Sequence, residues 1–366
     1  MTVVGAGVVG CATALALARR GVSVGVLEAE AEPGSAASGT NSGILHTGFD
    51  SVPGELETKL ILRSGQLREA VLAALGVPVV RCGARLRAAD AAGALAVNAR
   101  TNGVAVSLHA DGTLDVPGES VTDPVAYTRG LAAAATRHGA HLAMDFVVTS
   151  IERDGEALVC ASAGGKSVRS RVLVNCAGLH ADTVAGLAGD TSFEIYPRKG
   201  EFLVFDPPHG DHLDRILLPA PTKRTKGVLV FPTIDGKVIA GPTAVDQDDK
   251  RDWSVRPRAR DEIFPQAAAM WPPLEGSEQI GAYAGLRPAG RGVNYLIGRS
   301  RAGAALVNVA AIRSTGLTAS LGIADHVCAI VQAMGVRLAD ERPLIGVEAP
   351  RSARPWWRLA AERRAA

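Results

Sequence analysis

Three glycines near the start of the chain and one acidic residue after them carry the clearest chemical signal. Gly5, Gly7 and Gly10 follow the short apolar run 2–4, and a stretch of helix-forming residues follows them. A second apolar run then ends at Glu28, close to the roughly 20-residue spacing at which an acid meets a ribose. The order strand, Gly-x-Gly-x-x-Gly, helix, strand and acid is typical of a site that binds a dinucleotide.

Each glycine has its own physical task in such a site. Gly5 permits a tight turn, Gly7 lets a diphosphate approach the backbone, and Gly10 lets the helix pack closely on the sheet. The first N–H groups of the helix, including those of Val8 and Val9, have no partners within it and lie at its positive end. We therefore expect phosphates to bind here. The alternative interpretation is a glycine-rich turn without a ligand.

The acid at position 28 limits which dinucleotide can bind. The carboxylate of Glu28 can accept hydrogen bonds from both ribose hydroxyls, and it would repel the 2′-phosphate of NADP. The fingerprint therefore predicts FAD or NAD, and by itself it does not choose between them.

The composition is that of an ordinary globular protein. The 366 residues suggest about two domains, and 47% hydrophobic with 21% charged residues supply enough apolar material for a core. A net charge of +2 and an aromatic content of 4% give no sign of a nucleic-acid surface. We expect no nucleic-acid partner.

The cysteines and the first residues indicate a reduced, cytoplasmic protein. Five cysteines lie far apart, mostly in apolar runs, and no cysteines or histidines have the spacing of a metal site. No basic leader precedes the first apolar run, and no uncharged apolar run reaches about 18 residues. We therefore expect free thiols, no metal, no signal peptide and no membrane span.

Strands and helices that alternate in three separate stretches are expected to hold the dinucleotide site. We assign these stretches, residues 1–76, 120–190 and 286–340, to one discontinuous domain. Within them the pattern predicts helices at 55–75, 125–138 and 317–334, and strands at 146–151, 171–176 and 304–309.

The stretches between them have a different character. Residues 77–119 and 191–285 contain short β-like runs separated by turns, including the hairpin signal Asp235-Gly236. We assign them to a second, β-rich domain. Residues 341–366 carry many arginines and the pair Trp356-Trp357, and we expect a solvated or loosely docked tail. The alternative is a patch at a membrane interface, where tryptophan and arginine are favoured together.

Several further motifs, in order, resemble those of the FAD-dependent oxidoreductases of the D-amino acid oxidase superfamily. The resemblance is closest to the L-2-hydroxyglutarate oxidase and glycerol-3-phosphate dehydrogenase branches, and it extends from residue 3 to about residue 333. Each motif alone is weak, but the complete order is specific for the superfamily, although not for a substrate. The motifs are the N-terminal glycines with Glu28, then residues 38–46, 174–178, 197–201, 284–288 and 313–318.

The resemblance implies an α/β fold and FAD as the cofactor. It implies a discontinuous Rossmann-like FAD-binding domain and a smaller α+β substrate domain with a mostly antiparallel sheet. The small residues from 38 to 43 would line the flavin and the diphosphate, while the main chain of Val148 would hold the adenine. The residues implied to contact FAD beyond the first turn are Ser38, Thr40, Asn41, Ser42, Gly43, Val148, Ala177, Gly178, Ser314, Gly316, Leu317 and Thr318.

The resemblance also gives roles to the last helix and to three cations. The N–H groups at residues 316–318 would face the N1/C2 edge of the flavin, where negative charge develops on reduction. Arg287 matches the substrate arginine, whose guanidinium can bind a carboxylate through two parallel hydrogen bonds. The alternative for Arg287 is an internal salt bridge or a surface position. Arg313 and Lys199 are weaker candidates for flavin or substrate contact, and each can equally form a structural ion pair.

His46 stands in an apolar, glycine-flanked setting, and three roles stay open for it. In relatives a histidine at this position lies beside the flavin, so it can act as the base that takes the hydroxyl proton of an alcohol. It can also be a packed wall residue without chemistry. In some amine dehydrogenases of the wider superfamily it is bonded covalently to the ring.

Together these features predict a flavoenzyme that oxidises a small 2-hydroxy carboxylate by hydride transfer to flavin N5. The alternatives are a glycerol-3-phosphate dehydrogenase, an amine or amino-acid oxidase, and a non-catalytic flavoprotein. Asp50 stands where an arginine helps to bind phosphate in the glycerol-3-phosphate branch, and its charge would repel a phosphate. The electron acceptor, either oxygen or a quinone-like carrier, cannot be chosen from the sequence.

Overall fold

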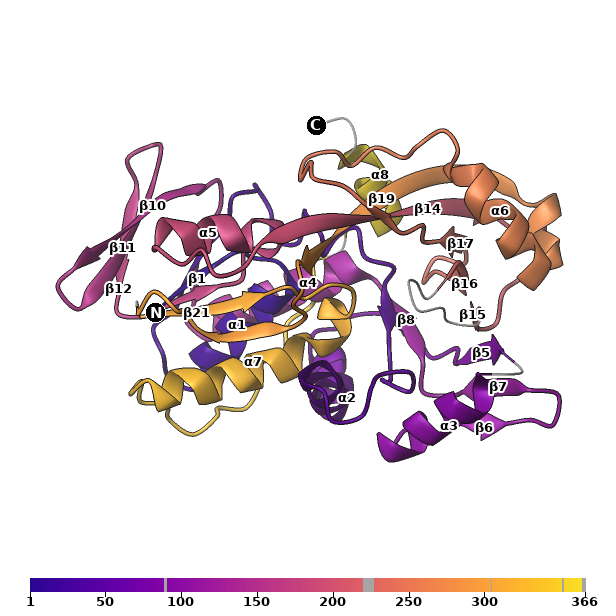
Figure 1. Cartoon of the computed structure of the whole chain (residues 1–366), viewed down its shortest axis with the longest axis horizontal. Helices are drawn as coiled ribbons and strands as arrows, with labels where there is room; N and C mark the ends of the chain where they lie inside the picture. Colours follow the sequence, from indigo (N-terminus) through magenta and orange to yellow (C-terminus); the bar gives the residue numbers. More distant parts are fainter. Residues whose placement is uncertain (89–90, 220–226, 304, 351, 364–366) are drawn as a thin grey trace.

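The computed structural model describes residues 1–366 except 89–90, 220–226, 304, 351 and 364–366. Two large sheets organise the described chain, one at each end of the long axis of the molecule (Figure 1). The first belongs to the predicted dinucleotide domain, and the second to the predicted β-rich domain.

The sheet of the dinucleotide domain has six strands in the order β20-β21-β13-β1-β2-β9, and β20 alone runs antiparallel to its neighbour. Side chains alternate between its two faces: Val3 and Val174 belong to one apolar cluster, and Val4 and Leu173 to another. Burial on both faces explains why the strands are almost wholly apolar. The strands are β1 (Thr2–Val4), β2 (Gly25–Leu27), β9 (His141–Ala143), β13 (Leu173–Asn175), β20 (Leu296–Arg299) and β21 (Leu306–Ala310).

Helices cover this sheet on both sides. Helices α1 and α7 contact each other on one face, where α4 packs on α1 and α2 packs on α7, while α5 lies on the other face (Figure 1). The start of α4 is capped by Asp123, whose carboxylate accepts hydrogen bonds from the N–H groups of Val125 and Ala126 at 2.8 and 2.9 Å. The helices are α1 (Val8–Arg19), α2 (Leu56–Ala74), α4 (Pro124–Arg137), α5 (Ala181–Leu187) and α7 (Gly316–Ala333).

Among the described residues, α7 is the one helix long and apolar enough to cross a membrane by length and composition. Its apolar side chains pack against α1, α2 and the sheet, and residues such as Ile323 and Val327 are fully buried there. This packing explains why α7 is so apolar: it is a core helix of the protein.

Two small three-stranded sheets accompany the two large ones. Strands β10 (Val148–Asp154), β11 (Ala157–Ser162) and β12 (Ser167–Ser170) form an antiparallel meander within the dinucleotide domain. Strand β8 (Ser120–Thr122) pairs on one side with β3 (Ile44–Leu45) and on the other with β4 (Val79–Val80). The second of these sheets connects the two domains.

The β-rich domain is built on a nine-stranded sheet that is antiparallel except where β5 meets β15. Its two longest strands, β14 and β19, pair along nearly their whole length, and α6 covers the sheet (Figure 1). The elements are β5 (Ala84–Arg87), α3 (Ala92–Thr101), β6 (Ser107–Leu108), β7 (Thr113–Val116), β14 (Ile195–Asp206), β15 (Ile216–Leu218), β16 (Leu229–Pro232), β17 (Val238–Gly241), β18 (Val245–Asp246), α6 (Ala259–Met270) and β19 (Glu278–Gly290); two 3-10 turns are η1 (Gly178–His180) and η2 (Pro272–Gly276).

The arrangement agrees with the predicted fold class. The hairpin signal Asp235-Gly236 lies in the turn between β16 and β17, with Gly236 at φ +77°. The expected boundary between residues 285 and 286 falls inside β19, so a single strand carries the chain from one predicted domain to the other. The expected strand 304–309 begins at a residue outside the described ones.

The C-terminal tail is docked, and the expectation of a solvated or loosely docked tail was wrong. Helix α8 (Trp356–Glu362) packs on β19 (Figure 1), and the side chains of Trp356 and Trp357 are buried. The indole N–H of Trp357 donates to the Asp235 carboxylate at 3.1 Å. The two rings find a partner surface in the β-rich domain, which the tail's own composition could not reveal.

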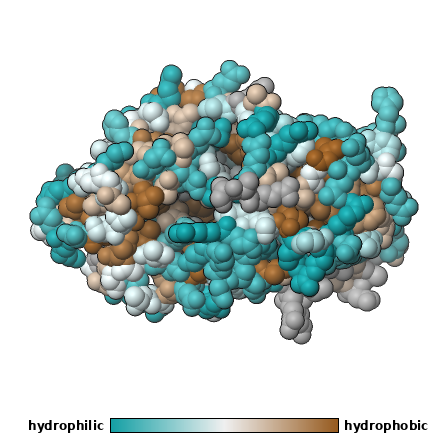
Figure 2. All heavy atoms as spheres, turned by 90° about the horizontal axis from the view of Figure 1, so that it is seen from above, coloured by the Kyte–Doolittle hydropathy of each residue, from teal (hydrophilic) through white to brown (hydrophobic). Residues whose placement is uncertain are grey.

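One face of the molecule is mostly hydrophilic (Figure 2), and the cysteine thiols are free. On the face drawn in Figure 2, apolar residues form separate groups among mostly hydrophilic ones. All five cysteines are free, and every one except Cys82 is buried. Burial raises the pKa of the Cys82 and Cys160 thiols to about 11, so they stay protonated at neutral pH.

Candidate active site

One large cavity, of about 920 Å³, runs from the N-terminal glycine turn to the strands β14 and β19. Glu28 and Val148 lie along one part of it, and His46, Arg287 and Arg313 along another. Its volume lies at the upper end of the roughly 300–1,000 Å³ usual for ligand and cofactor sites. The cavity therefore has room for a ligand as large as a dinucleotide.

The glycine turn is a cradle that side chains would fill. Gly5 has φ +101°, and a Cβ added there would come 2.5 Å from the carbonyl oxygen of Cys176. A Cβ on Gly10 would come 2.0 Å from the carbonyl oxygen of Gly5, so this glycine lets α1 pack against the turn. A Cβ on Gly7 would meet only the Ser38 hydroxyl, at 3.2 Å, so its open side faces the cavity.

The acid of the fingerprint lies where the sequence placed it. The carboxylate of Glu28 lines the cavity and accepts hydrogen bonds from the N–H groups of Ala6 and Glu30. Burial raises the pKa of Glu28, although these hydrogen bonds act in the opposite direction. Each carboxylate oxygen keeps further acceptor capacity, so ribose hydroxyls can still bind there.

Most of the residues expected to contact FAD line this cavity. Three of them do not line it. Gly10 and Gly43 lie where an added Cβ would meet neighbouring backbone, and the hydroxyl of Thr318 accepts from the N–H of His46 at 3.0 Å. The expected cofactor residues that do line it are Gly5, Gly7, Val8, Val9, Glu28, Ser38, Thr40, Asn41, Ser42, Val148, Ala177, Gly178, Ser314, Gly316 and Leu317.

Arg287 is a partly buried cation in the part of the cavity that also holds His46 and Arg313. Its guanidinium donates to the carbonyl oxygen of Thr243 at 3.1 Å, and no acidic side chain among the described residues forms an ion pair with it. Burial, with the like charges of Arg198 and Arg313, lowers the pKa of Arg287 to about 10. Arg287 therefore stays charged at neutral pH.

A glycine makes room for this guanidinium. A Cβ on Gly200 would come 2.1 Å from Nη2 of Arg287, so any side chain there would displace it. Gly200 belongs to the 197–201 motif, and this close approach gives a physical reason for a glycine in it.

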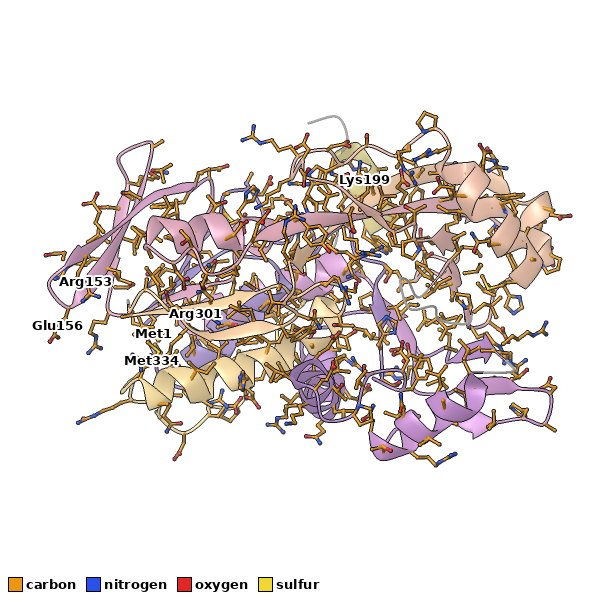
Figure 3. The ribbon with its side chains drawn as sticks, in the orientation of Figure 1. Met1, Arg153, Glu156, Lys199, Arg301 and Met334 are labelled. Carbon is orange, nitrogen blue, oxygen red and sulfur yellow. The ribbon has the colours of Figure 1, made fainter. Side chains whose placement is uncertain are left out.

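Lys199 is not brought to the cavity. Its ammonium lies 2.6 Å from the carboxylate of Asp252, its side chain is 2% exposed, and it lies on β14 in the β-rich sheet (Figure 3). The pKa of Asp252 falls to about 2 beside this ammonium. Lys199 therefore has the structural ion pair that the sequence left as its alternative, and this corrects its place among the candidate catalytic residues.

His46 faces the cavity with a partner that the sequence did not suggest. Its Nδ1 lies 2.8 Å from Oε2 of Glu119, whose side chain is fully buried. The register of β3 and β8 places them together, because Leu45 pairs with Ser120 and the next residues along are His46 and Glu119. Glu119 is the last residue of the stretch 77–119 and belongs to none of the motifs, so no local signal marked it.

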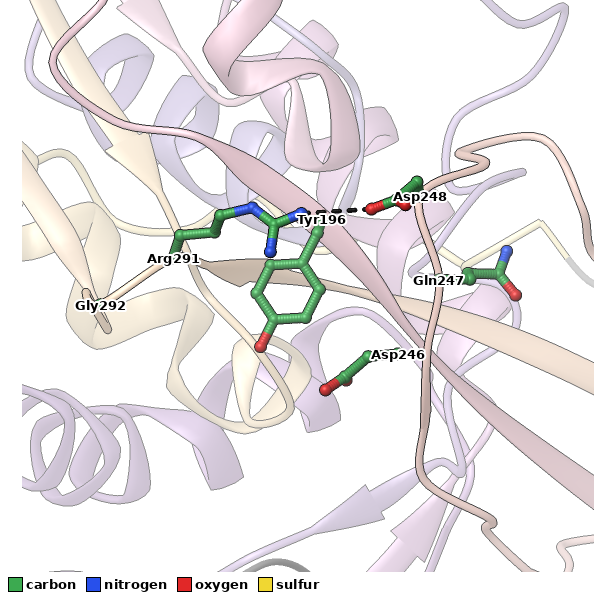
Figure 4. A pocket seen from close by; sticks show the side chains of 6 residues that line it. All are labelled: Tyr196, Asp246, Gln247, Asp248, Arg291 and Gly292. Carbon is green, nitrogen blue, oxygen red and sulfur yellow. Dashed lines mark hydrogen bonds and ion pairs between the residues drawn. The ribbon is translucent and has the colours of Figure 1, made fainter.

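A second, smaller hollow lies outside this cavity (Figure 4). Its charged groups are engaged with neighbours: the guanidinium of Arg291 lies 5.0 Å from the ring centroid of Tyr196 and bonds to Asp248. Asp246, on the same rim, pairs with Arg198 at 3.1 Å. The hollow holds none of the expected site residues, and we assign it no ligand.

The two domains and the cavity between them fit a dinucleotide-binding oxidoreductase. The glycine cradle, the partly buried Glu28 and the open N-terminus of α7 at Gly316 and Leu317 suit the diphosphate, the ribose and the flavin of FAD. Among the described residues, no group of three or more histidine, cysteine, aspartate or glutamate side chains could hold a metal ion.

Comparison with known proteins defines the family. Residues 1–330 match the DAO family, described as FAD dependent oxidoreductase, and the chain belongs to it. A glycerol 3-phosphate dehydrogenase from Caloramator mitchellensis is 28% identical over 355 residues, which cover 91% of this chain and 73% of that protein. The mitochondrial L-2-hydroxyglutarate dehydrogenase of Mus musculus is 29% identical over 283 residues, covering 66% of this chain and 60% of that protein.

A solved structure confirms the fold. The dithionite-reduced L-alpha-glycerophosphate oxidase from Mycoplasma pneumoniae, with FAD bound, has a TM-score of 0.87 at 24% identity, covering 96% of this chain and 98% of that chain. The protein is therefore an FAD-dependent oxidoreductase, and the expected enzyme class, fold class and cofactor are confirmed.

Proposed function

We propose that this protein oxidises a small 2-hydroxy carboxylate, with Arg287 as its anchor and His46 as its proton acceptor. One observation carries the proposal: Arg287 is a partly buried cation with no acidic partner among the described residues, and it lines the same cavity as His46. A charge withdrawn from water without a counter-charge is costly. An anionic substrate would supply that counter-charge.

The planar guanidinium suits a carboxylate. Arg287 can donate two parallel hydrogen bonds to it, and this fixes the orientation of the carbon next to the carboxylate. Arg313 and Arg198 line the same cavity and add to its positive potential. The three arginines thus draw a small anion to one end of the cavity.

His46 supplies the acid–base part of the reaction. Bound FAD would supply the acceptor, its N5, for the hydride of the substrate carbon. The O–H bond of the substrate breaks as its carbonyl forms, and the proton moves to a ring nitrogen of His46. Nδ1 is engaged with Glu119, so Nε2 is the nitrogen available to a group in the cavity. The electrons then pass to an acceptor, for which we propose oxygen or a quinone-like carrier.

A second candidate substrate is glycerol 3-phosphate. The similarity to a glycerol 3-phosphate dehydrogenase extends over 91% of this chain. The charge of Asp50 argued against a phosphate substrate, but Asp50 is not among the residues that line the cavity. The expected repulsion therefore has no support from the position of Asp50, and a phosphate would also supply a counter-charge to Arg287.

Anaerobic mixing of the holoenzyme with separate compounds tests the proposal. A panel of 2-hydroxy acids, glycerol 3-phosphate and amino acids is added, and loss of the oxidised flavin absorbance is followed. We expect a 2-hydroxy acid to bleach the flavin fastest. Faster bleaching by glycerol 3-phosphate would favour the second candidate, and bleaching by amino acids alone would favour an amino-acid oxidase. Bleaching by none would contradict all three.

A further inference from the structure

The strongest unexplained feature near the cavity is the fully buried carboxylate of Glu119 behind His46. Its two oxygens are well satisfied: Oε2 lies 2.8 Å from Nδ1 of His46, and Oε1 accepts from the N–H and the hydroxyl of Thr47 at 2.6 and 2.8 Å. Burial alone would raise the pKa of Glu119, but the charge and hydrogen bond of His46 and the bonds from Thr47 lower it overall. The carboxylate is therefore ionised at neutral pH.

The backbone around His46 is held as firmly as its ring. The N–H of His46 donates to the Thr318 hydroxyl at 3.0 Å, and its carbonyl accepts from the guanidinium of Arg68 at 3.2 and 3.3 Å. A Cβ on Gly118 would lie 2.8 Å from the methyl carbon of Thr47, so a glycine brings the Glu119 turn close. His46 is therefore held both at its ring, by Glu119, and at its backbone, by Thr318 and Arg68.

An ionised carboxylate has only acceptor atoms, and this determines which imidazole nitrogen carries the proton. Nδ1 must donate to Oε2 of Glu119, since two acceptors 2.8 Å apart would repel. The neutral ring then keeps its lone pair on Nε2. This nitrogen is the one available to the cavity that His46 lines.

The Glu119 carboxylate also stabilises the positive charge that His46 gains when it takes the substrate proton. Once Nε2 takes a proton, the ring is a cation whose nearest counter-charge is the buried Glu119. Arg68 is partly buried nearby, and it donates to the carbonyl of His46 rather than to Glu119. Attraction at this distance is strong in a buried site, so the imidazolium is stabilised where it forms.

From these contacts we infer that Glu119 is a positioning residue for the oxidation: it holds His46 in the Nδ1–H form, presents Nε2 to the substrate hydroxyl, and stabilises the resulting imidazolium. This inference rests on the proposed function for His46 as the proton acceptor. It assigns a role in the reaction to a residue that does not itself touch the substrate.

The decisive variant is Glu119→Gln, which has nearly the same shape. Its amide oxygen can still accept from Thr47, while its amide N–H would donate to Nδ1 and force the proton onto Nε2. We expect flavin reduction to slow by about 10²- to 10⁴-fold, as when the orienting acid of a histidine base becomes an amide. The dissociation constant of a non-oxidisable carboxylate, read from the flavin spectrum, should stay unchanged because Arg287 is intact.

Two further variants separate this role from a structural one. Glu119→Asp keeps the charge at a longer distance from Nδ1, so it should recover part of the rate lost in Glu119→Gln. Thr47→Val removes a hydroxyl bond to Glu119 but leaves the imidazole contact, and its rate should stay within about threefold of the wild type. A Thr47→Val loss as large as that of Glu119→Gln would overturn the inference.

A readout without turnover is nitrogen NMR of the histidine-labelled holoenzyme, with His46→Asn used to assign the signal. We expect the Nδ1–H form in the wild type and the Nε2–H form in Glu119→Gln. An Nε2–H form in the wild type would overturn the inference even if Glu119→Gln failed to fold. If no panel compound bleached the flavin, the proposed substrate would fail, while this spectrum would still test the pairing.

Discussion

Arg198 and Arg287 stand directly opposite each other on the paired strands β14 and β19, and both reach the same cavity. Side chains opposed in an antiparallel pair share one face of the sheet, so two like charges are placed side by side. Asp246 balances Arg198 at 3.1 Å, whereas the one side-chain hydrogen bond of Arg287 to a described residue is to the carbonyl of Thr243. The unbalanced charge of the pair is therefore at Arg287.

Replacing Arg287 by alanine tests its role as the anchor. We expect Arg287→Ala to weaken carboxylate binding by about 2 kcal/mol or more, roughly 30-fold, since a charge-assisted pair is lost. Binding is measured by titrating a non-oxidisable 2-hydroxy acid analogue against the flavin spectrum. Arg291→Ala is the control, because Arg291 lies at the separate smaller hollow. Equal affinities in all three proteins would exclude the anchoring role.

A substitution in the glycine cradle is expected to weaken cofactor binding without affecting folding. A Cβ on Gly7 would come 3.2 Å from the Ser38 hydroxyl and meet no other atom within 4 Å, and Gly7 lines the cavity where a diphosphate would lie. We expect Gly7→Ala to lower FAD affinity at least tenfold, while the melting temperature of the apoprotein stays within about 2 °C. Gly93→Ala is the matched control, because nothing lies within 4 Å of its added Cβ. Full FAD affinity in Gly7→Ala would argue against this path for the diphosphate.

The docked tail should help to retain the cofactor. Arg363 lines the cavity, where its guanidinium donates to Glu30 at 2.6 Å and to the carbonyl of Ser35 at 2.9 Å and lies over the ring of Trp253. We expect Arg363→Ala to speed FAD release roughly fivefold, the equivalent of about 1 kcal/mol. Release is followed by the rise of flavin fluorescence after dilution.

The control for the tail is Arg354→Ala, which breaks an exposed ion pair with Glu362 away from the cavity. It should release FAD at the wild-type rate. If Arg363→Ala also kept that rate, the tail would have no part in holding FAD.

Asp190 should contribute to stability in a defined acid range. Burial would raise its pKa, but hydrogen bonds from Ser192, Ser300 and Arg301 lower it to about 2, against an ordinary 3.8. Because the folded state binds this proton less readily than the unfolded state, the contribution is complete above about pH 4. It is lost as the pH falls toward 2, and it amounts to about 2 kcal/mol.

Urea unfolding at pH 6 and at pH 3 measures this contribution. In Asp190→Asn the amide cannot ionise, so the variant should be less stable at pH 6 and should lose less stability on acidification than the wild type. The same loss in both proteins would show that Asp190 plays no part in the acid response.

Much of the nucleotide site could be predicted from the sequence because its parts are local. A turn that needs φ +101° at Gly5, a helix that starts directly after it and an acid at the end of the next strand lie within 28 residues. Short-range backbone geometry decides these features. The hairpin at Asp235-Gly236 was predictable for the same reason.

The tertiary structure determines which of the predicted cations reach the cavity. Arg198 and Lys199 are neighbours in one motif, yet successive side chains of a strand point to opposite faces of the sheet. Arg198 therefore lines the cavity, while Lys199 is buried against Asp252. The sequence shows the alternation, but only the packed sheet shows which face borders the cavity.

By itself, the sequence was enough to predict a dinucleotide site at the first turn and the residues expected to surround it. The partner of His46 is 73 residues away, and the surface that buries Trp356 and Trp357 belongs to another domain. Such contacts arise when distant strands pair and apolar surfaces are removed from water together. Strand register and long-range burial, which no local pattern encodes, made the Glu119–His46 pair and docked the tail.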